Sequence, residues 1–281
     1  MKSRLSLKKI GFHTFVLSLS LLFILPLFWM ISSSFKTEQQ IYSDMTSLRA
    51  FFPSIKNFTI KPYTELLGSY NIFRNMLNSL LYSVITVASS LIINSLAGYA
   101  LAKMKLPFKK IFMIAIVGLI IVPTEATILP MYLIVNRLGL VNTIPGVILP
   151  FSASVMSIFL YRQYFLKFPT ELIEAGKIDG LSSVQIFFRI VVPVSIPIYI
   201  TTGVLTFLAS WNDFLWPVMV ISRERMMPIQ VALSAIFADR ENIFTNHMMA
   251  GLTLATIPVI LIYLIFQKYI VQGIATTGSK G

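Results

Sequence analysis

Residues that could do catalytic chemistry are few in this sequence, and they form no recognisable catalytic set. No Gly-x-x-x-x-Gly-Lys-[Ser/Thr] phosphate-binding loop occurs, because Gly176-Lys177 lacks both the upstream glycine and the following hydroxyl residue. Paired carboxylates, a serine–histidine pair and a His-Glu-x-x-His motif are also missing. The chain has no cysteine, and its histidines are His13 and His247, so metal clusters of these residues are not expected. The sequence therefore predicts no enzyme, no metal site and no cofactor bound by this chain.

Polar side chains within or at the ends of apolar runs are the better candidates for function. Glu125 lies in such a run, and an acid at membrane depth is costly unless it serves a function. It also lies near the end of the run, where it could be a solvated residue at the membrane surface. Trp211, Asn212 and Asp213 end a later run and combine an aromatic face with hydrogen-bonding groups, the mixture that binds sugar rings. The alternative for Trp211, together with Trp216, is a belt of tryptophans at the lipid interface.

A stripe of small and polar residues runs along another apolar segment. Ser90, Asn94, Gly98 and Ala102 recur at every fourth position, which places them on one face of a helix. Such a stripe allows helices to approach closely in lipid, or it can line a pore. Asn94 is therefore a further candidate for the substrate path, beside the interpretation that it packs inside a helix bundle.

The composition is that of a membrane protein. Of the 281 residues, 56% are apolar and 12% are charged, and the mean hydropathy is +0.79. Few soluble proteins are this apolar, and the length suits a single transmembrane domain over residues 1–281. The net charge of +12 could indicate nucleic-acid binding in a soluble protein. In a membrane protein it reflects basic residues kept on the cytoplasmic side, so no nucleic-acid partner is expected.

Six apolar runs are long enough to span a membrane as helices. The first follows a basic N-terminus, and its full bilayer length without a small-x-small cleavage site predicts an uncleaved span rather than a signal peptide. Pro123 and Pro130 interrupt the third. Basic residues gather at the N-terminus, at 103–110, after the fourth run and in the tail, so both termini are predicted to be cytoplasmic. We expect an all-α membrane protein with spans at about 12–31, 76–102, 111–135, 144–161, 194–214 and 247–266.

A polar segment, residues 170–193, lies between the fourth and fifth predicted spans and has its own helix signals. Thr170 is positioned to cap a first helical piece. Asp179-Gly180 would end that piece, because glycine tolerates the left-handed conformation that closes a helix.

The second piece of this segment also has a recognisable start and end. Ser182 and Gln185 form a capping-box pattern that opens a helix at Ser183, and the helix is predicted to run to Val192. Pro193 then marks the entry into the fifth span. The segment is therefore predicted to be a helix-turn-helix arm, here called the arm, at the cytoplasmic membrane surface.

The spacing within the arm resembles the EAA loop of ABC-importer membrane subunits: Glu-Ala-Ala, three residues, Gly, nine residues, Ile-x-Leu-Pro. Val192 replaces the leucine, and Gly176 departs from the second alanine, which loosens the helix by up to ~1 kcal/mol but keeps the side chain small. The matching residues are Glu174, Ala175, Gly180, Ile190 and Pro193. The resemblance implies that these residues, with Gly176 and Asp179, dock on a separate ATPase.

Two further segments resemble the sugar-importing branch, similar to the inner subunit of maltose transporters. They are Phe35-Lys36-Thr37 and Asn75…Asn78-Ser79. The resemblance implies a prokaryotic cytoplasmic membrane complex of two different permease subunits, an ATPase dimer that binds ATP-Mg, and an extracytoplasmic solute-binding protein. It further implies that closure of the ATPase pair drives alternating access through the arm. The tail from Gly278 to Gly281 would reach toward the ATPase pair, or it is a frayed terminus.

Other functions remain open at this point. The chain could be an ABC permease for another small solute. A self-contained ion-coupled transporter would need buried, paired ionisable residues near the midplane, and Glu125 is the one candidate in the sequence. An intramembrane enzyme would need a convergent catalytic set.

Overall fold

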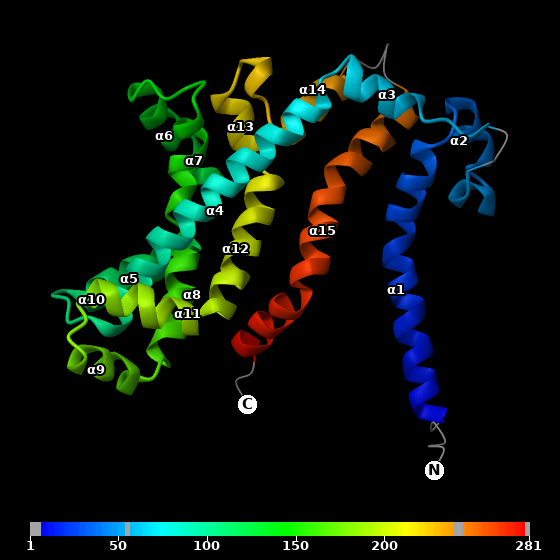
Figure 1. Ribbon diagram of the computed structural model, residues 1–281. Coiled ribbons are helices and arrows are strands. Elements are labelled where there is room, and N and C mark those ends of the chain that lie inside the picture. Colours follow the sequence, from blue (N-terminus) through cyan, green and yellow to red (C-terminus); the bar gives the residue numbers. More distant parts are fainter. Residues whose placement is uncertain (1–6, 54–56, 239–243, 279–281) are drawn as a thin grey trace. The chain divides into compact units, whose positions relative to one another are not determined.

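The computed structural model describes residues 7–53, 57–238 and 244–278, and within these ranges it is helical and has no strand (Figure 1). This confirms the all-α expectation. In chain order the helices are α1 (Leu7–Ser34), α2 (Glu38–Asp44), η1 (Leu48–Phe51), α3 (Lys61–Gly68), α4 (Ile72–Lys103), α5 (Lys109–Ile121), α6 (Thr124–Arg137), α7 (Ile144–Ser152), α8 (Val155–Leu166), α9 (Thr170–Ile178), α10 (Ser183–Ile186), η3 (Phe187–Val191), α11 (Val192–Val194), α12 (Ile196–Trp211), α13 (Leu215–Val220), η4 (Glu224–Met226), α14 (Ile229–Ala238) and α15 (Thr245–Gly278).

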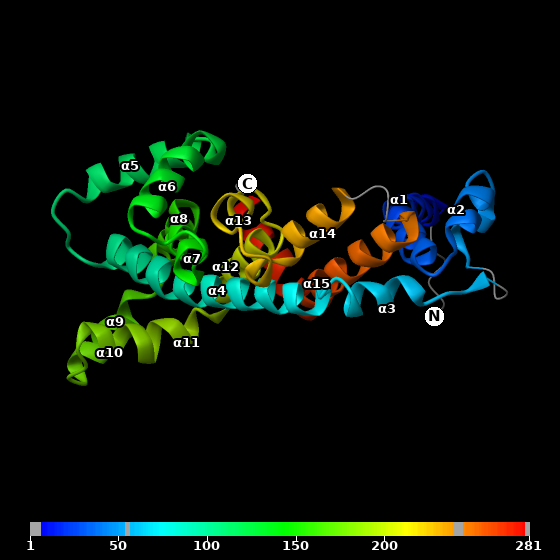
Figure 2. The same ribbon diagram turned by 90° about the horizontal axis from the view of Figure 1, so that it is seen from above.

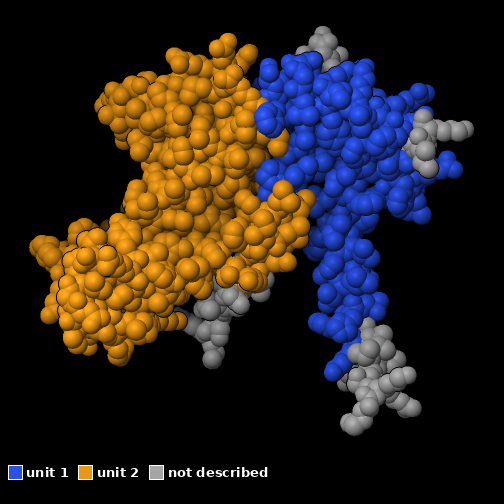
Figure 3. All heavy atoms as spheres, in the orientation of Figure 1, with its two compact units in different colours: residues 1–73, 232–258 blue, residues 74–231, 259–281 orange. Residues whose placement is uncertain are grey.

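The chain divides into two compact units, which Figure 3 colours separately. Unit 1 comprises residues 1–73 and 232–258, and unit 2 comprises residues 74–231 and 259–281. The arm and all the predicted substrate-path residues belong to unit 2.

In the described part of the chain, three helices are long and apolar enough to cross a membrane as single elements. They are Gly11–Ser34 within α1, the whole of α4, and Thr245–Tyr269 within α15. Pro26 in α1 and Pro258 in α15 lie inside their helices without ending them. The most apolar stretch of α1 has no residue buried within the chain, as suits a helix that is apolar on every side and faces lipid or another protein.

The other three predicted spans each consist of two helical pieces that meet at a bend. The angles are 106° between α5 and α6, 42° between α7 and α8, and 82° between Ser183–Val194 and α12. The third span was predicted to be interrupted at both prolines, but the break lies at Pro123 alone and Pro130 lies within α6. Val122 before the proline is extended, with ψ 121°, because the proline ring disfavours the helical conformation of the preceding residue.

The fourth predicted span was expected to end at Tyr161, before Arg162, but α8 continues to Leu166. Tyr161 and Phe165 are both fully buried and lie one helical turn apart. Burial of the face that carries Tyr161 and Phe165 stabilises the helix beyond Arg162. A span boundary placed at the first charged residue is therefore too early.

Helix α4 is the long element of unit 2, and different parts of the chain attach to its two ends. Its 32 residues span about 48 Å. At the N-terminal end, the Nδ2 atoms of Asn75 and Asn78 donate to the carbonyl of Met227 at 2.9 and 3.0 Å. At the C-terminal end, Lys103 Nζ donates to the carbonyl of Phe168 at 2.7 Å. Figure 2 shows α5 to α8 on one side of α4 and α9 to α11 on the other.

Unit 1 is organised around a buried lysine in the loop after α1. Lys36 is 0% exposed, and its Nζ donates to the carbonyls of Arg49 at 2.6 Å and Ala50 at 3.0 Å and pairs with Asp44 Oδ2 at 3.2 Å. Asn246 Nδ2, at the start of α15, donates to the Lys36 carbonyl at 3.0 Å. These bonds hold α2 and η1 against the ends of two long helices, α1 and α15.

Candidate functional site: a surface arm and a cavity

The first helix of the arm, α9, ends as the sequence predicts but begins differently. Pro169 is the N-cap residue, so Thr170 lies inside the helix and does not cap it. The Thr170 hydroxyl lies 3.5 Å from Lys103 Nζ and accepts from it instead. At the other end Gly180 has φ +77°. Its N–H donates to Lys177 O at 3.1 Å, and the N–H of Leu181 donates to Gly176 O at 3.0 Å. These two bonds form a Schellman motif, which confirms the glycine turn.

The second piece opens with the predicted capping box. The Ser182 hydroxyl accepts from the Gln185 N–H at 3.3 Å, and Gln185 Oε1 accepts from the Ser182 N–H at 2.8 Å. The piece stays helical to Val194, two residues beyond the predicted end, and includes a π-helix over Phe187–Val191. A π-helix has no sequence signal at this length, and such turns are frequent at functional sites.

The arm has an exposed outer face and a buried inner face. Glu174, Ala175 and Asp179 are exposed, whereas Gly176 is buried. A Cβ added to Gly176 would lie 2.8 Å from Ile190 Cδ1 and 3.1 Å from an Ile186 side-chain carbon. The glycine that departs from the EAA pattern therefore allows the two helices of the arm to pack closely.

An aromatic cluster joins the inner face of the arm to the long helices. Phe187 of the π-helix lies 5.1 Å, centroid to centroid, from Tyr99 on α4, and Tyr99 contacts Phe165 on α8 edge to face at 5.7 Å. Tyr161 on α8 shares a 2.7 Å hydrogen bond with the Thr202 hydroxyl on α12. The inner face of the arm therefore packs against a cluster of side chains that extends to α4, α8 and α12.

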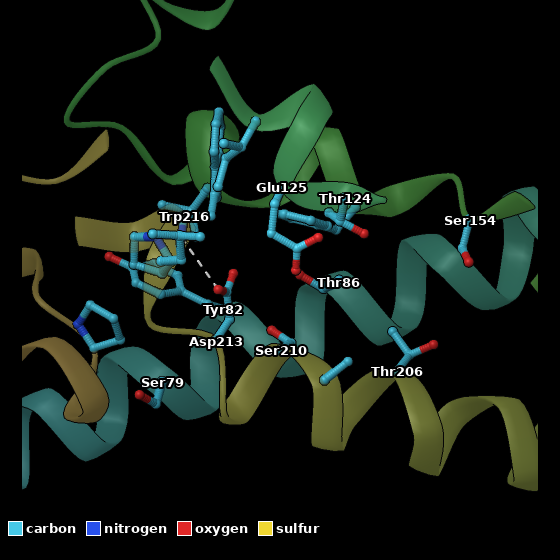
Figure 4. A pocket seen from close by; sticks show the side chains of 17 residues that line it. Ser79, Tyr82, Thr86, Thr124, Glu125, Ser154, Thr206, Ser210, Asp213 and Trp216 are labelled. Carbon is cyan, nitrogen blue, oxygen red and sulfur yellow. Dashed lines mark hydrogen bonds between the residues drawn. The ribbon is translucent and has the colours of Figure 1, made fainter. Parts of the chain in front are cut away.

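Toward the other end of α4, unit 2 contains a cavity of about 350 Å³ with both apolar and polar side chains in its walls (Figure 4). Helices α4, α6, α7, α12 and α13 contribute to it. It is lined by Ser79, Tyr82, Thr86, Thr124, Glu125, Ile128, Val147, Phe151, Ser154, Thr206, Ala209, Ser210, Asp213, Leu215, Trp216, Pro217 and Pro228. Hydroxyl groups and two carboxylates supply its polar atoms, and no lysine, arginine or histidine is among these described residues.

Two of the predicted substrate-path residues, Glu125 and Asp213, line this cavity. Glu125 lies in the first turn of α6, and Asp213 follows α12. Figure 4 shows both carboxylates pointing toward the same space. Asp213 Oδ1 accepts from the Trp216 N–H at 3.3 Å, and Trp216 Nε1 donates to Gly146 O at 3.1 Å. These bonds fix the wall of the cavity formed by α13.

The other three predicted residues lie outside the cavity. Asn94 is 0% exposed, and its Oδ1 accepts from the Ser154 N–H at 2.9 Å, a backbone group that the α7–α8 bend leaves outside the helices. Asn212 Nδ2 donates to Leu208 O of its own helix at 2.8 Å. Trp211 is 2% exposed and stacks on Phe207.

The tryptophan-belt alternative does not fit the burial of these side chains. An interfacial belt leaves its indole rings toward lipid, whereas Trp211 is 2% and Trp216 is 1% exposed. The stripe on α4 fits the packing interpretation, since a Cβ at Gly98 would lie 2.5 Å from Tyr161 Cβ.

Comparison with known proteins places this architecture in a family. Residues 94–276 match the family described as binding-protein-dependent transport system inner membrane component. The chain belongs to this family. The match includes the arm, α12 and most of α15, and it confirms the resemblance to ABC-importer permeases drawn from the EAA-like spacing.

Relatives of this permease carry transport names. It is 32% identical over 98% of its length to the arabinooligosaccharides transport system permease protein AraQ of Bacillus subtilis (strain 168), covering 97% of that protein. It is 33% identical to the lactose transport system permease protein LacG of Rhizobium radiobacter, with 92% of each chain covered. A chain from the crystal structure of a bacterial ABC transporter involved in the import of the acidic polysaccharide alginate shares its fold. That likeness has a TM-score of 0.79 and 23% identity, and covers 95% of this chain and 99% of the other.

Sequence reasoning missed most of the hydroxyl residues that line the permease's cavity. Ser79, Tyr82 and Thr86 continue the small and polar stripe toward the N-terminus of α4 at spacings of three and four, and all are buried. The same spacing of small and polar residues, extended from Ser90 toward the N-terminus, is the sequence signal for these positions. Thr206 and Ser210 on α12 are one turn apart and carried the same signal.

Proposed function

We propose that this permease is the pore subunit of an ATP-driven importer for sugars or oligosaccharides. The observation that carries the proposal is the arm, residues 170–193, with its exposed outer face, its glycine turn and its aromatic attachment to the long helices. An exposed arm attached in this way suits docking in a cleft of a separate ATPase. Of the residues that the EAA resemblance implies, the exposed ones are proposed to contact the ATPase: Glu174, Ala175, Asp179, Gly180 and Pro193. Gly176 is buried and Ile190 packs against it, so these two are proposed to support docking by holding the two helices of the arm together.

The proposed partners are a second permease subunit, an ATPase dimer that holds ATP-Mg, and an extracytoplasmic solute-binding protein. The family description supports such an assembly, since it names binding-protein-dependent transport. In the proposed arrangement the chain crosses the cytoplasmic membrane six times, each bent pair counting as one span, with both termini and the arm in the cytoplasm. The proposed contact of the tail with the ATPase pair involves residues 279–281, which lie outside the described residues.

The proposed mechanism follows from how the arm and the cavity share helices. When ATP closes the ATPase pair, the arm moves, and the contact of Phe187 with Tyr99 transmits the movement to α4. Tyr82 and Thr86 of the same helix line the cavity. A solute in the cavity would exchange its water for hydroxyl and carboxylate partners, and tilting of α4 and α12 would open or close its path.

Sugars fit the proposal through the relatives' names and the lining of the cavity. The hydroxyl groups around a sugar ring form hydrogen bonds with Ser, Thr and Tyr hydroxyls and with carboxylates. The apolar faces of the sugar ring pack well against aromatic side chains. The cavity offers both kinds of surface, with Phe151 and Trp216 among its aromatic residues. Another small polar solute remains the second candidate.

Reconstitution tests the proposed function. The full chain should co-purify with an ATPase subunit, and ATP hydrolysis in proteoliposomes should rise when the loaded binding protein is added. Uptake driven by an ion gradient without ATP would instead favour a secondary transporter and would contradict the proposal. A panel of neutral oligosaccharides and unrelated polar solutes, offered to the binding protein, would identify the solute class.

Cavity variants test the solute path. We expect Asp213→Asn and Glu125→Gln to raise the solute concentration for half-maximal uptake about fivefold to tenfold, because an amide oxygen accepts a hydrogen bond from the solute about half as strongly as a carboxylate does. Basal ATP hydrolysis should not change. Asn212→Ala is the matched control, because its side chain bonds to its own helix and does not reach the cavity. Unchanged concentration dependence in both cavity variants would place the binding site in the partner permease.

A further inference from the structure

The turn between α4 and α5 in unit 2 is strongly basic. Lys103, Lys105, Lys109 and Lys110 lie within residues 103–110, and no acid lies among them. Two of them, Lys109 and Lys110, are the first residues of α5. A cation at the N-terminus of a helix destabilises the helix, because it opposes the helix dipole. Repulsion between the four charges adds to this cost. The charges therefore need an explanation beyond the stability of the turn.

The four lysines divide into two pairs with different roles. Lys103 Nζ donates to the Phe168 carbonyl at 2.7 Å, and Lys109 Nζ donates to the Ala102 carbonyl at 3.2 Å, so this pair holds the turn in place. Lys105 and Lys110 are exposed and have no hydrogen-bond or ion-pair partner in the described part of the chain. This second pair presents two ammonium groups on a turn whose position is fixed by the first pair.

Large apolar side chains stand exposed beside the free lysines. Phe108 is 71% exposed, Met104 is 45% exposed and Ile111 is 61% exposed. Helix α5, which continues from the turn, has no buried residue at all. Exposed apolar side chains next to exposed cations are the pattern of the headgroup level of a bilayer, where acyl chains cover the former and phosphates pair with the latter.

We propose that Lys105 and Lys110 bind the head group of an acidic phospholipid, whose acyl chains lie along the exposed face of α5. Charge complementarity selects an anion, and the adjoining apolar side chains select an anion that carries hydrocarbon. A soluble anion would leave Phe108 and Ile111 uncovered. The site adjoins the arm, because Lys103 of the same turn bonds to Phe168 immediately before it. The lipid would thus help to fix the end of α4 to which the arm attaches.

Native mass spectrometry of the detergent-purified full chain, with any subunits that accompany it, tests the proposal. Phosphatidylglycerol and phosphatidylcholine of identical acyl chains are titrated separately, and the apparent affinities for the first bound lipid are compared. Wild type should bind phosphatidylglycerol more tightly than phosphatidylcholine. In K105Q/K110Q the ratio of the two apparent affinities should fall roughly tenfold. K105R/K110R should keep the wild-type ratio, since the charges remain.

A matched control removes two exposed cations elsewhere in unit 2. R223Q/R225Q should keep the phosphatidylglycerol preference of wild type, because these residues lie in the loop that attaches to the other end of α4. An unchanged preference in K105Q/K110Q would overturn the proposal, as would an equal loss in R223Q/R225Q. Displacement of the bound lipid by millimolar inorganic phosphate would also overturn it, by showing that the site takes soluble anions. If K105Q/K110Q weakened retention of the ATPase equally in both lipids, the lysines would belong to a protein contact instead.

Discussion

Gly180 is the single residue on which the geometry of the arm depends most directly. Its φ of +77° lies in the left-handed region, and no atom lies within 4 Å of the place that a Cβ would occupy. A side chain there would meet no steric obstacle, so its cost is conformational, ~1 kcal/mol or more for a β-branched residue. We expect Gly180→Val to reduce ATP-driven uptake by roughly fivefold or more, the equivalent of that free energy. Membrane insertion should be unaffected.

Two companion variants separate backbone conformation from side-chain size at this turn. Gly180→Asn should keep most of the uptake, because asparagine adopts the left-handed conformation more readily than valine. Gly68→Val should keep it too, since Gly68 also has open space around its Cβ position but no left-handed backbone. Wild-type uptake by Gly180→Val would show that the turn does not control coupling.

Gly176 presents the opposite situation, a glycine required by close packing. Gly176→Ala gains up to ~1 kcal/mol of helix propensity, but its Cβ would meet Ile190 Cδ1 at 2.8 Å and Ile186 at 3.1 Å. Overpacking of this kind costs about 1–3 kcal/mol. We expect Gly176→Ala alone to lower the thermal unfolding midpoint or leave it unchanged. Adding Ile190→Val, which removes the Cδ1 atom, should raise it again.

The double substitution tests whether Gly176 and Ile190 are in contact. Ile190→Val alone should cost ~0.5–1.5 kcal/mol, because it removes a methyl group from a half-buried side chain that packs within the arm. If the effects of Gly176→Ala and Ile190→Val on the unfolding midpoint were additive, the two positions would not be in contact and the packing account would be wrong.

At the level of elements, local signals in the sequence predicted the arm well. The glycine turn and the capping box depend on a few neighbouring residues, and both are present as predicted. The N-cap at Thr170 was wrong because the preceding proline occupies the capping position. The bends within the spans depend on tertiary contacts. Asn94, sixty residues before Ser154, satisfies the backbone at the α7–α8 bend, and no local pattern reveals such a partner.

The candidate cavity was predicted only in part for the same reason. Glu125 and Asp213 stand out as acids in apolar surroundings, so sequence reasoning found them. Asn212 was included with its neighbour Asp213, but adjacent residues on a helix end point in different directions, and only Asp213 lines the cavity. Which neighbour faces inward is set by how α12 packs, which the sequence alone does not state.

Within unit 1, an acid–imidazole pair joins α3 to α15. Glu65 Oε2 lies 2.6 Å from His247 Nε2. The hydrogen bond to His247 is the main cause that lowers the pKa of Glu65 below its ordinary value of 4.5, with help from Lys61 and against partial desolvation. A carboxyl whose folded pKa is depressed stabilises the fold above its unfolded pKa, and this contribution is lost as pH falls through the folded pKa.

This linkage predicts how the Glu65→Gln variant behaves with pH. Wild type should have the higher thermal unfolding midpoint at neutral pH, and the difference should shrink as pH falls below 4.5 and Glu65 takes up its proton. Glu224→Gln is the control, because Glu224 is exposed and its carboxylate has no hydrogen-bond or ion-pair partner among the described residues. A difference between wild type and Glu65→Gln that stayed constant down to about pH 3 would contradict the linkage.

At the scale of the whole molecule, the bent helix pairs α5–α6 and α7–α8 attach to α4 at both of its ends. These two ends are here called the two levels of unit 2. Asn142, after α6, accepts from the N–H of Arg223 at 3.1 Å, and the carbonyl of Arg225 accepts from Asn78 at the N-terminal end of α4. The start of α5 and the end of α8 lie at the other end, where Lys109 and Lys103 make their bonds. Each of α5–α6 and α7–α8 therefore runs from one level to the other despite its bend.

Single-cysteine labelling can decide whether the sharply bent α5–α6 pair crosses the membrane. The chain has no cysteine of its own, so each introduced thiol is the only one in the chain. We expect Lys105→Cys and Asp179→Cys to react with a membrane-impermeant maleimide only from the cytoplasmic side, and Arg137→Cys and Arg223→Cys only from the opposite side. All four positions are exposed, so access should depend on the side of the membrane. If Arg137→Cys reacted from the same side as Lys105→Cys, the 106° bend would mark a re-entrant loop, and the six-span arrangement would have to be abandoned.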